Sequence, residues 1–202
     1  MREIPAERTR RDEYKEATHH ALLVAGRNIF AQEGFQGTRI EMISRAARVT
    51  RGALYHHFED KKALFDAVVV LMQAEAAVKI EKEARKQPKI WDRLTVGIGA
   101  YLDICLDPAY ARIVVQEAPA VLGADRYREI EETYPQALLK ETLKALKRQG
   151  ELDCQDIDLL SRVADAMICK MAILLPDAKD PKRLRKRGQV LIVNLLEGIR
   201  KR

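Results

Sequence analysis

The sequence is poor in the features that mark several protein classes. Its longest apolar run, Ala67–Met72, is far shorter than the roughly 18 residues that cross a membrane. Only 7 prolines and 10 glycines occur among 202 residues, which excludes collagen-like and low-complexity chains. The N-terminal stretch Met1–Lys15 is charged and lacks the apolar core of an export signal. We therefore expect a cytoplasmic protein that has no membrane partner.

Groups that support metal binding or catalysis are also scarce. The three cysteines, Cys105, Cys154 and Cys169, are odd in number and form no C-x-x-C spacing, which argues against disulfides and zinc ribbons. The pairs His19–His20 and His56–His57 have no further ligand at a suitable spacing. The sequence contains no glycine-rich phosphate loop, nucleophile elbow or H-E-x-x-H motif. We expect no metal, no cofactor and no enzyme activity.

The composition that remains can bury a core, since 47% of residues are hydrophobic and 33% are charged. The net charge of +6 divides into +3 over residues 1–62, −4 over 63–178 and +7 over 179–202. Basic segments favour polyanions such as nucleic acid, but a solvated surface is the simpler interpretation of charge alone. We interpret the basic run Lys182–Arg187 and the acids Glu131 and Glu132 as solvated, and nucleic-acid binding by Lys182–Arg187 stays open.

Helical periodicity without sustained alternation predicts an all-α fold of about nine helices. Thr38, Thr50 and Asp60 are expected N-caps, and Pro135 is expected to kink or divide a long helix. The second helix is expected to bury Ile40, Ile43 and one of the alanines at 46 and 47. The predicted helices span approximately residues 12–33, 39–47, 51–57, 61–87, 89–106, 109–121, 125–149, 155–175 and 181–198.

The segment Thr38–Leu64 contains two short helices joined by a tight turn, which is typical of a helix-turn-helix. Its second helix, Arg51–His57, has small residues near its start and polar groups along its length. A helix that enters a DNA groove needs a slim N-terminal end and side chains that contact bases and phosphates. This segment therefore predicts DNA recognition.

The same segment resembles the DNA-binding domain of the TetR (tetracycline repressor) family of bacterial regulators. The match covers about 50 residues in order and with the family's spacing, and the chain length and the helical remainder also agree. The matching positions are Phe30, Gly34, Thr38, Val49, Thr50, Gly52, Tyr55, His57, Phe58, Lys61 and Leu64.

The resemblance implies a role for each matched position. Arg51, Gly52 and Ala53 would lie at base edges, with Arg51 reading guanine through its bidentate fork. Lys61 would bind a phosphate at the start of its helix. Residues expected to contact the DNA backbone or the groove are Thr38, Arg39, Arg48, Thr50, Tyr55, His56 and His57.

Three residues depart from the family pattern. Arg48 stands where glycine is common in the turn, and a side chain at positive φ costs about 1 kcal/mol. Ser44 replaces a usual alanine, so its hydroxyl must bond back to its helix or stay unpaired. Glu41 lies on the side that faces DNA, where it would repel phosphate or select cytosine. These departures bear on the operator sequence.

The larger part of the chain, by the same resemblance, binds a small effector and forms a two-fold dimer. The last two helices support a dimer independently, because they carry wide apolar faces with little chain left to cover them. The effector is expected among the middle helices, in a pocket that suits an apolar ligand with one polar group. The inward-facing candidates are Ile98, Tyr101, Cys105, Tyr134, Leu138, Met167 and Met171. Ordinary core packing is an equal alternative for each of them.

We predict a DNA-binding domain over residues 1–62 and an effector-binding and dimerisation domain over 63–202. The expected function is a ligand-responsive transcriptional regulator, a repressor that binds a palindromic operator in double-stranded DNA as a homodimer and is released by its effector. Two alternatives remain: an all-helical enzyme, and a sequence-nonspecific nucleoid or scaffold protein.

Overall fold

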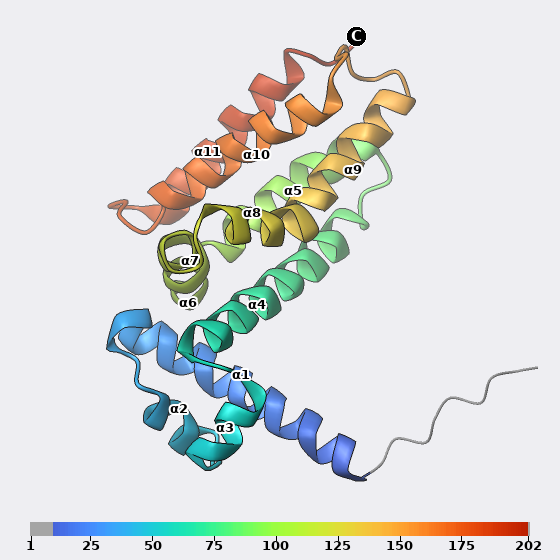
Figure 1. Cartoon of the computed structure of the whole chain (residues 1–202). Coiled ribbons are helices and arrows are strands. Elements are labelled where there is room, and N and C mark those ends of the chain that lie inside the picture. The colour runs from blue at the N-terminus through green and yellow to red at the C-terminus, as the bar shows by residue number, and fades with distance from the viewer. Residues whose placement is uncertain (1–9, 202) are drawn as a thin grey trace, which may run out of the picture. The chain divides into compact units, whose positions relative to one another are not determined.

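The computed structural model describes residues 10–201, and over these residues the fold is helical (Figure 1). The described residues contain no strand, and one isolated antiparallel bridge pairs Leu152 with Arg200. The helices are α1 (Arg10–Gly37), α2 (Ile40–Ala46), α3 (Arg51–His57), α4 (Lys61–Ala84), α5 (Ile90–Ile104), α6 (Pro108–Tyr110), the π-helical segment η1 (Ala111–Glu117), α7 (Ala118–Leu122), α8 (Ala124–Thr133), α9 (Pro135–Arg148), α10 (Ile157–Leu174) and α11 (Pro181–Glu197).

The chain folds into two compact units, of which the first ends at Val68 and the second begins at Val69. The boundary lies within α4, a little later than the sequence-based boundary at residue 62. The reason is that Leu64, Phe65 and Val68, on the first turns of α4, are fully buried. Phe65 packs edge-on against Phe30 of α1, with ring centroids 5.0 Å apart. The first turns of α4 therefore belong to the core of the first unit.

Within the first unit, α1 supports the two short helices. The helical backbone of α1 is interrupted at Gly34, whose φ of 72° is easily adopted by glycine and ends the regular part of the helix. Ile43 of α2 and Leu54 of α3 are completely buried, as is Phe30 of α1. The expected burial of Ile40 and Ile43 is confirmed. The expectation for Ala46 and Ala47 is wrong, because Ser44 occupies the interior instead and donates its hydroxyl to the Ile40 carbonyl at 3.0 Å.

Two helices predicted in the second unit are divided, and the division at Pro135 confirms the sequence-based expectation. Pro135 separates α8 from α9, because proline begins a helix readily but disrupts a helix interior. The expected helix over 109–121 is instead α6, the π-helical segment η1 and α7, which Gly123 ends at a φ of 90°.

Close helix packing in the second unit depends on two glycines. At Gly99 of α5, an added Cβ would lie 2.6 Å from the Gln189 side chain and 2.7 Å from that of Arg185. At Gly188 of α11, an added Cβ would lie 2.5 Å from the Met171 sulfur. These glycines allow α11 to pack against both α5 and α10, and Figure 1 shows α10 and α11 lying side by side. Arg185 joins α11 to α5 by donating to the Gly99 carbonyl and the Asp103 carboxylate, both at 2.6 Å.

The faces of α10 and α11 that do not contact the rest of the second unit carry several exposed hydrophobic side chains. Their large hydrophobic side chains are between 45% and 59% exposed. On α10 these are Leu159, Val163, Ile173 and Leu174, and on α11 they are Val190, Leu191 and Leu195. We call this set the α10–α11 face.

Candidate nucleic-acid interface and ligand cavity

The turn before α3 has the geometry that the sequence predicts. Arg48 adopts a φ of 57°, so a left-handed residue does occupy the position where glycine is common. Thr50 then caps α3, because its side-chain oxygen accepts a hydrogen bond from the Ala53 amide at 3.0 Å. The helix runs from Arg51 to His57 and buries only Leu54. The rest of its surface is left for solvent or a partner.

Arg51 stands at the exposed start of α3 between an acid and an aromatic ring. Its guanidinium lies 2.9 Å from the Glu41 carboxylate of α2 and 5.5 Å from the centre of the Tyr55 ring. The side chain is 63% exposed, so a DNA base could reach it. Glu41 therefore orients Arg51 in the free protein and must release it, or share it, when Arg51 contacts a base.

The remaining candidates on this surface differ in exposure. Arg39, Arg48, Thr50, Gly52 and His56 are exposed, and Tyr55 is 42% exposed, whereas Ala53 is half-buried. His57 is also half-buried, with its ring 5.7 Å from that of His19 on α1. Burial lowers the pKa of His57, and the neighbouring His19 lowers it further, so we expect a neutral imidazole near pH 7.

Thr38 does not have its predicted role. The residue is 2% exposed, and its hydroxyl donates to the Gly34 carbonyl at 2.6 Å. The N-cap of α2 is Arg39, which makes no side-chain capping bond. The prediction that Thr38 caps α2 is wrong, because its hydroxyl closes the end of α1 instead, and its contact with a phosphate stays a prediction.

Lys61 stands at the start of α4, as the sequence predicts, but its ammonium group already has partners. The nitrogen donates to the carbonyls of Phe35 at 2.7 Å and Thr38 at 2.9 Å, and it lies 4.4 Å from the centre of the Phe35 ring. These bonds hold the segment between α1 and α2 against α4. Lys61 thus has a structural function in the first unit, whether or not it also contacts a phosphate.

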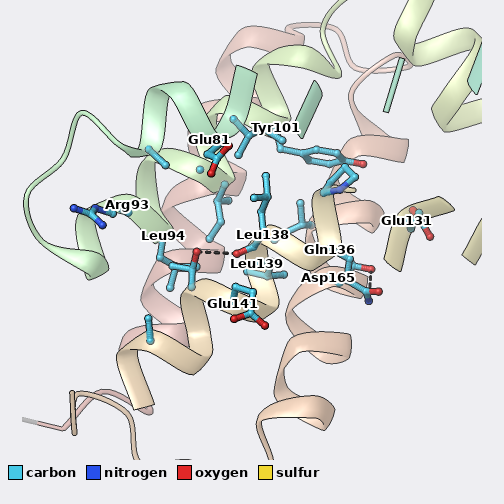
Figure 2. A pocket seen from close by; sticks show the side chains of 18 of the residues that line it. Glu81, Arg93, Leu94, Tyr101, Glu131, Gln136, Leu138, Leu139, Glu141 and Asp165 are labelled. Carbon is cyan, nitrogen blue, oxygen red and sulfur yellow. Dashed lines mark hydrogen bonds between the residues drawn. The ribbon is translucent and has the colours of Figure 1, made fainter. Parts of the chain in front are cut away.

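The second unit contains a cavity of about 280 Å³ among α4, α5, α8, α9 and α10 (Figure 2). Its wall is mostly apolar, and Ile80, Leu94, Ile168 and their neighbours supply most of it. Figure 2 shows Glu131, Gln136 and Asp165 on one side of the cavity and Arg93 on the opposite side. An apolar space with a few polar groups at its ends has the composition of a small-molecule site.

Three of the predicted pocket residues, Ile98, Tyr101 and Leu138, line this cavity. Cys105, Tyr134, Met167 and Met171 do not line it, so the prediction that they form the pocket is wrong for this cavity. Cys105 is buried in the core, and burial raises the pKa of its thiol to about 12, which also argues against a reactive thiolate. Tyr134 is the non-helical link between α8 and α9.

The two methionines miss the cavity because of their position around α10. Asp165, Ile168 and Cys169 follow the three- and four-residue spacing of one helix face, and all three line the cavity. Met167 lies two residues beyond Asp165, about 200° around the helix. Met171 packs instead at Gly188 of α11.

The cavity contains polar residues that sequence reasoning missed. Glu131, interpreted as solvated, lines it, whereas the adjacent Glu132 is exposed. Burial raises the pKa of Glu131 to about 7, helped by the neighbouring Asp165, and burial raises the pKa of Asp165 to about 6. The sequence signal for an inward Glu131 is its place next to the apolar Ile130 on the predicted helix. Helical spacing alone does not distinguish an acid that faces inward from a solvated one.

The described residues contain neither a metal-binding cluster nor a membrane-spanning helix. Residues 10–201 contain no group of three or more His, Cys, Asp or Glu side chains placed to hold a metal ion. No helix within that range has the length and apolar character needed to span a membrane.

Both units match known protein families. Residues 22–68 match the bacterial regulatory proteins of the tetR family, and residues 91–199 match the tetracyclin repressor-like C-terminal domain. The first match contains α2, α3 and the buried start of α4, and the second contains most of the cavity wall. The family matches indicate a regulator rather than an enzyme.

Individual proteins agree with this assignment. The transposon Tn10 TetC protein of Escherichia coli is 28% identical over 180 residues, which are 88% of each chain. The transcriptional regulator AcrR of Shigella flexneri is 42% identical over 67 residues, about a third of each chain. A TetR-family regulator from Pectobacterium atrosepticum has a crystal structure with a TM-score of 0.80 and 30% identity, covering 96% of this chain and 99% of that one. These matches cover both the unit that contains the exposed helix α3 and the unit that contains the cavity. The chain therefore belongs to the TetR family of DNA-binding transcriptional regulators.

Proposed function

We propose that the protein is a repressor that binds a palindromic operator as a homodimer and leaves it when a small molecule fills the cavity of the second unit. The observation that carries this proposal is the pairing of an exposed, capped α3 with a separate apolar cavity in one chain. Such a protein acts on DNA in the cytoplasm, and repression is the action named in the family description of the second unit.

The DNA contacts would centre on the N-terminal half of α3. Arg51 has the exposure and the bidentate fork for a guanine, and Gly52 and Ala53 leave room for the helix to approach base edges. Arg39, Arg48, Thr50, Tyr55 and His56 supply exposed donors for phosphates or bases, and His57 and Lys61 would contribute at the edge of the surface.

The dimer would form through the α10–α11 face. Two copies of this pair of helices, related by a two-fold axis, would cover each other's exposed leucines and valines in a four-helix arrangement. A two-fold dimer would also present two copies of α3 to operator half-sites one helical turn apart. Leu191→Arg should therefore yield monomers in sedimentation, while Lys182→Glu, at an exposed position of the same helix, should not.

The ligand signal would travel along α4. Gln73, Ile80 and Glu81 of this helix line the cavity, and Lys61, Leu64 and Phe65 at its start belong to the first unit. A ligand that binds one position of α4 better than another would shift the population between DNA-bound and released forms.

Selection from a pool of random duplexes tests this function most directly. A palindromic consensus is expected, and Arg51→Ala should weaken binding to it about tenfold or more and relax preference at one base position. The control Lys62→Ala removes an exposed cation outside the predicted contacts. Equal affinity for selected and random duplexes at matched salt would instead support a nonspecific nucleoid or scaffold protein, and turnover of a substrate without DNA selection would support an enzyme.

A further inference from the structure

The polar end of the cavity in the second unit is acidic. Glu131 of α8 and Asp165 of α10 both line it, and Gln136 of α9 donates to the Asp165 carboxylate at 3.3 Å. Cys169 lies between the two acids and donates to Glu131 at 3.6 Å. The two carboxyl groups thus belong to one buried cluster at one side of the cavity (Figure 2).

These acids differ from the other acids that line the same cavity. Glu81 is paired with Arg85 at 2.6 Å, and Glu141 is paired with Lys144 at 2.8 Å. Besides burial, Asp165, Tyr127 and Cys169 influence the ionisation of Glu131. Besides burial, Cys169 influences that of Asp165, and none of these groups is a cation. A buried carboxylate is costly unless an opposite charge or several hydrogen bonds compensate it.

A second polar group on the cavity wall, the side-chain amide of Gln73, is only partly hydrogen-bonded. Gln73 of α4 lines the wall and is 1% exposed, and its carbonyl oxygen accepts a hydrogen bond from the Tyr110 hydroxyl at 2.7 Å. Its side-chain nitrogen has no hydrogen-bond partner among the residues that the structure describes. Buried amide groups are nearly always satisfied in native proteins, so an unpaired donor on a cavity wall indicates a missing acceptor.

We propose that the cavity binds an apolar organic amine, with its ammonium group against Glu131 and Asp165 and a hydrogen-bond acceptor of the ligand at the Gln73 amide. The apolar wall between these points, which includes Ile98, Leu138 and Ile168, accommodates the hydrocarbon part. The Tyr101 ring, which also lines the cavity, provides an aromatic face for a cation. This inference rests on the proposed function only in taking the cavity as the effector site.

The electrostatics agree with a cationic ligand. In the free protein, burial raises the pKa of both carboxyl groups, so each holds a proton more tightly than in water. A bound ammonium group would reverse this effect and restore the charged carboxylates. A ligand carboxylate would have the opposite effect and would meet two acids of its own sign.

Calorimetric titration of the full-length protein at about pH 8 tests the charge preference. The probes are phenylbutylamine, phenylbutanol and phenylbutyrate, which share one skeleton and differ in charge. The amine is expected to bind about tenfold or more tightly than the alcohol, and the carboxylate least tightly. Binding of the carboxylate or the alcohol as tightly as the amine, or no measurable binding of the amine, overturns the proposal.

Variants locate the charge. Glu131→Gln and Asp165→Asn should each reduce amine affinity about tenfold and remove most of its advantage over the alcohol. Glu132→Gln makes the same charge change at an exposed position of the same helix and should leave the preference intact. Thermal melting checks that each variant folds, and an equal loss in Glu132→Gln would mean that the preference arises from overall charge.

A matched pair of amines tests Gln73. Phenoxypropylamine replaces one methylene of phenylbutylamine by an ether oxygen, so it supplies an acceptor without a change in length. It should bind more tightly than phenylbutylamine to the parent and lose this advantage in Gln73→Met. Because these titrations contain no DNA, a protein that selects an operator but ignores amines would refute only the ligand class. A protein that binds amines but selects no DNA would refute only the regulatory function.

Discussion

The surface around α3 and the acidic end of the cavity both concentrate charge, but they treat it in opposite ways. Arg51 and Glu41 are more than half exposed and already paired with each other. Glu131 and Asp165 line a cavity, and among residues 10–201 no cation is paired with either of them. Exposed charges lose little when they exchange a protein partner for water or DNA, whereas buried acids without a cation either keep a proton or need an opposite charge. The charges of the first region can therefore change partners at little cost, whereas ionisation of the acids in the second region is costly.

The largest effect is expected at Lys61, a charge of the first unit that is half-buried and bonded within the protein. Its ammonium group is bonded to two carbonyls, so Lys61→Ala removes a hydrogen bond from each of them. We expect a loss of about 2 to 3 kcal/mol in the free energy of unfolding, measured by urea denaturation without DNA. The neighbouring Lys62 is exposed, and Lys62→Ala should change stability by less than about 0.5 kcal/mol. Equal stability of the two variants would mean that Lys61 serves only DNA.

The pH dependence of stability measures the cost of the buried acid. The pKa of Glu131 is about 7 in the folded protein against an ordinary value of 4.5, so the folded state binds the proton more tightly than the unfolded state. Its stabilising contribution is complete below pH 4.5 and is lost as the pH rises to about 7. Between about pH 5 and pH 8, the free energy of unfolding should fall by about 1 to 2 kcal/mol less in Glu131→Gln than in the parent.

Urea unfolding at the two pH values gives this difference directly. Glu132→Gln serves as the matched control, because its exposed carboxyl group should leave the pH dependence of the parent unchanged. If the parent and Glu131→Gln responded equally to pH, Glu131 would be solvated in the folded protein, and the contrast between the two regions would disappear.

A smaller effect is expected from the paired charge at α3. Glu41→Gln frees Arg51 and removes a negative charge from the surface that would face phosphates. We expect affinity for random duplex DNA to rise about threefold to tenfold at low salt, with stability unchanged because the pair is exposed. Glu13→Gln removes an exposed acid elsewhere in the first unit and should have little effect. Weaker binding by Glu41→Gln would indicate that Glu41 itself contacts a base.

The sequence predicted the first unit well because its signals are local. Thr50, Arg48 and the limits of α3 follow from cap and turn chemistry within a few residues. Thr38 was misassigned because a threonine that precedes a helix often caps that helix. In the folded chain the backbone turns at Gly34, and the Thr38 hydroxyl donates to the Gly34 carbonyl at the end of α1 instead. Local rules fail there because two helix ends compete for one hydroxyl.

The cavity could not be predicted to the same degree, because packing of distant segments defines it. Ile98, Tyr101 and Leu138 were found from helical spacing, but Gln73 comes from α4, and its carbonyl oxygen accepts a hydrogen bond from Tyr110, 37 residues away. The adjacent acids Glu131 and Glu132 have the same composition around them and opposite environments. Which of the two faces inward depends on the rotation of α8 against α9, which no local pattern specifies.

The smallest expected effect concerns Arg48, where stability and DNA affinity should change in opposite directions. Its φ of 57° costs roughly 1 kcal/mol for a residue with a side chain, and glycine removes this cost while it adds flexibility to the unfolded chain. We expect Arg48→Gly to raise the free energy of unfolding by about 0.5 kcal/mol, or at most 1 kcal/mol.

The affinity of Arg48→Gly for the selected operator should fall, and the salt slope should decrease by about one if the exposed arginine binds a phosphate. Arg48→Asn, which also tolerates a left-handed backbone, separates the two effects, because it should lose the charge and recover only part of the stability. An unchanged salt slope in both variants would remove Arg48 from the DNA contacts and leave its strained backbone as a property of the turn alone.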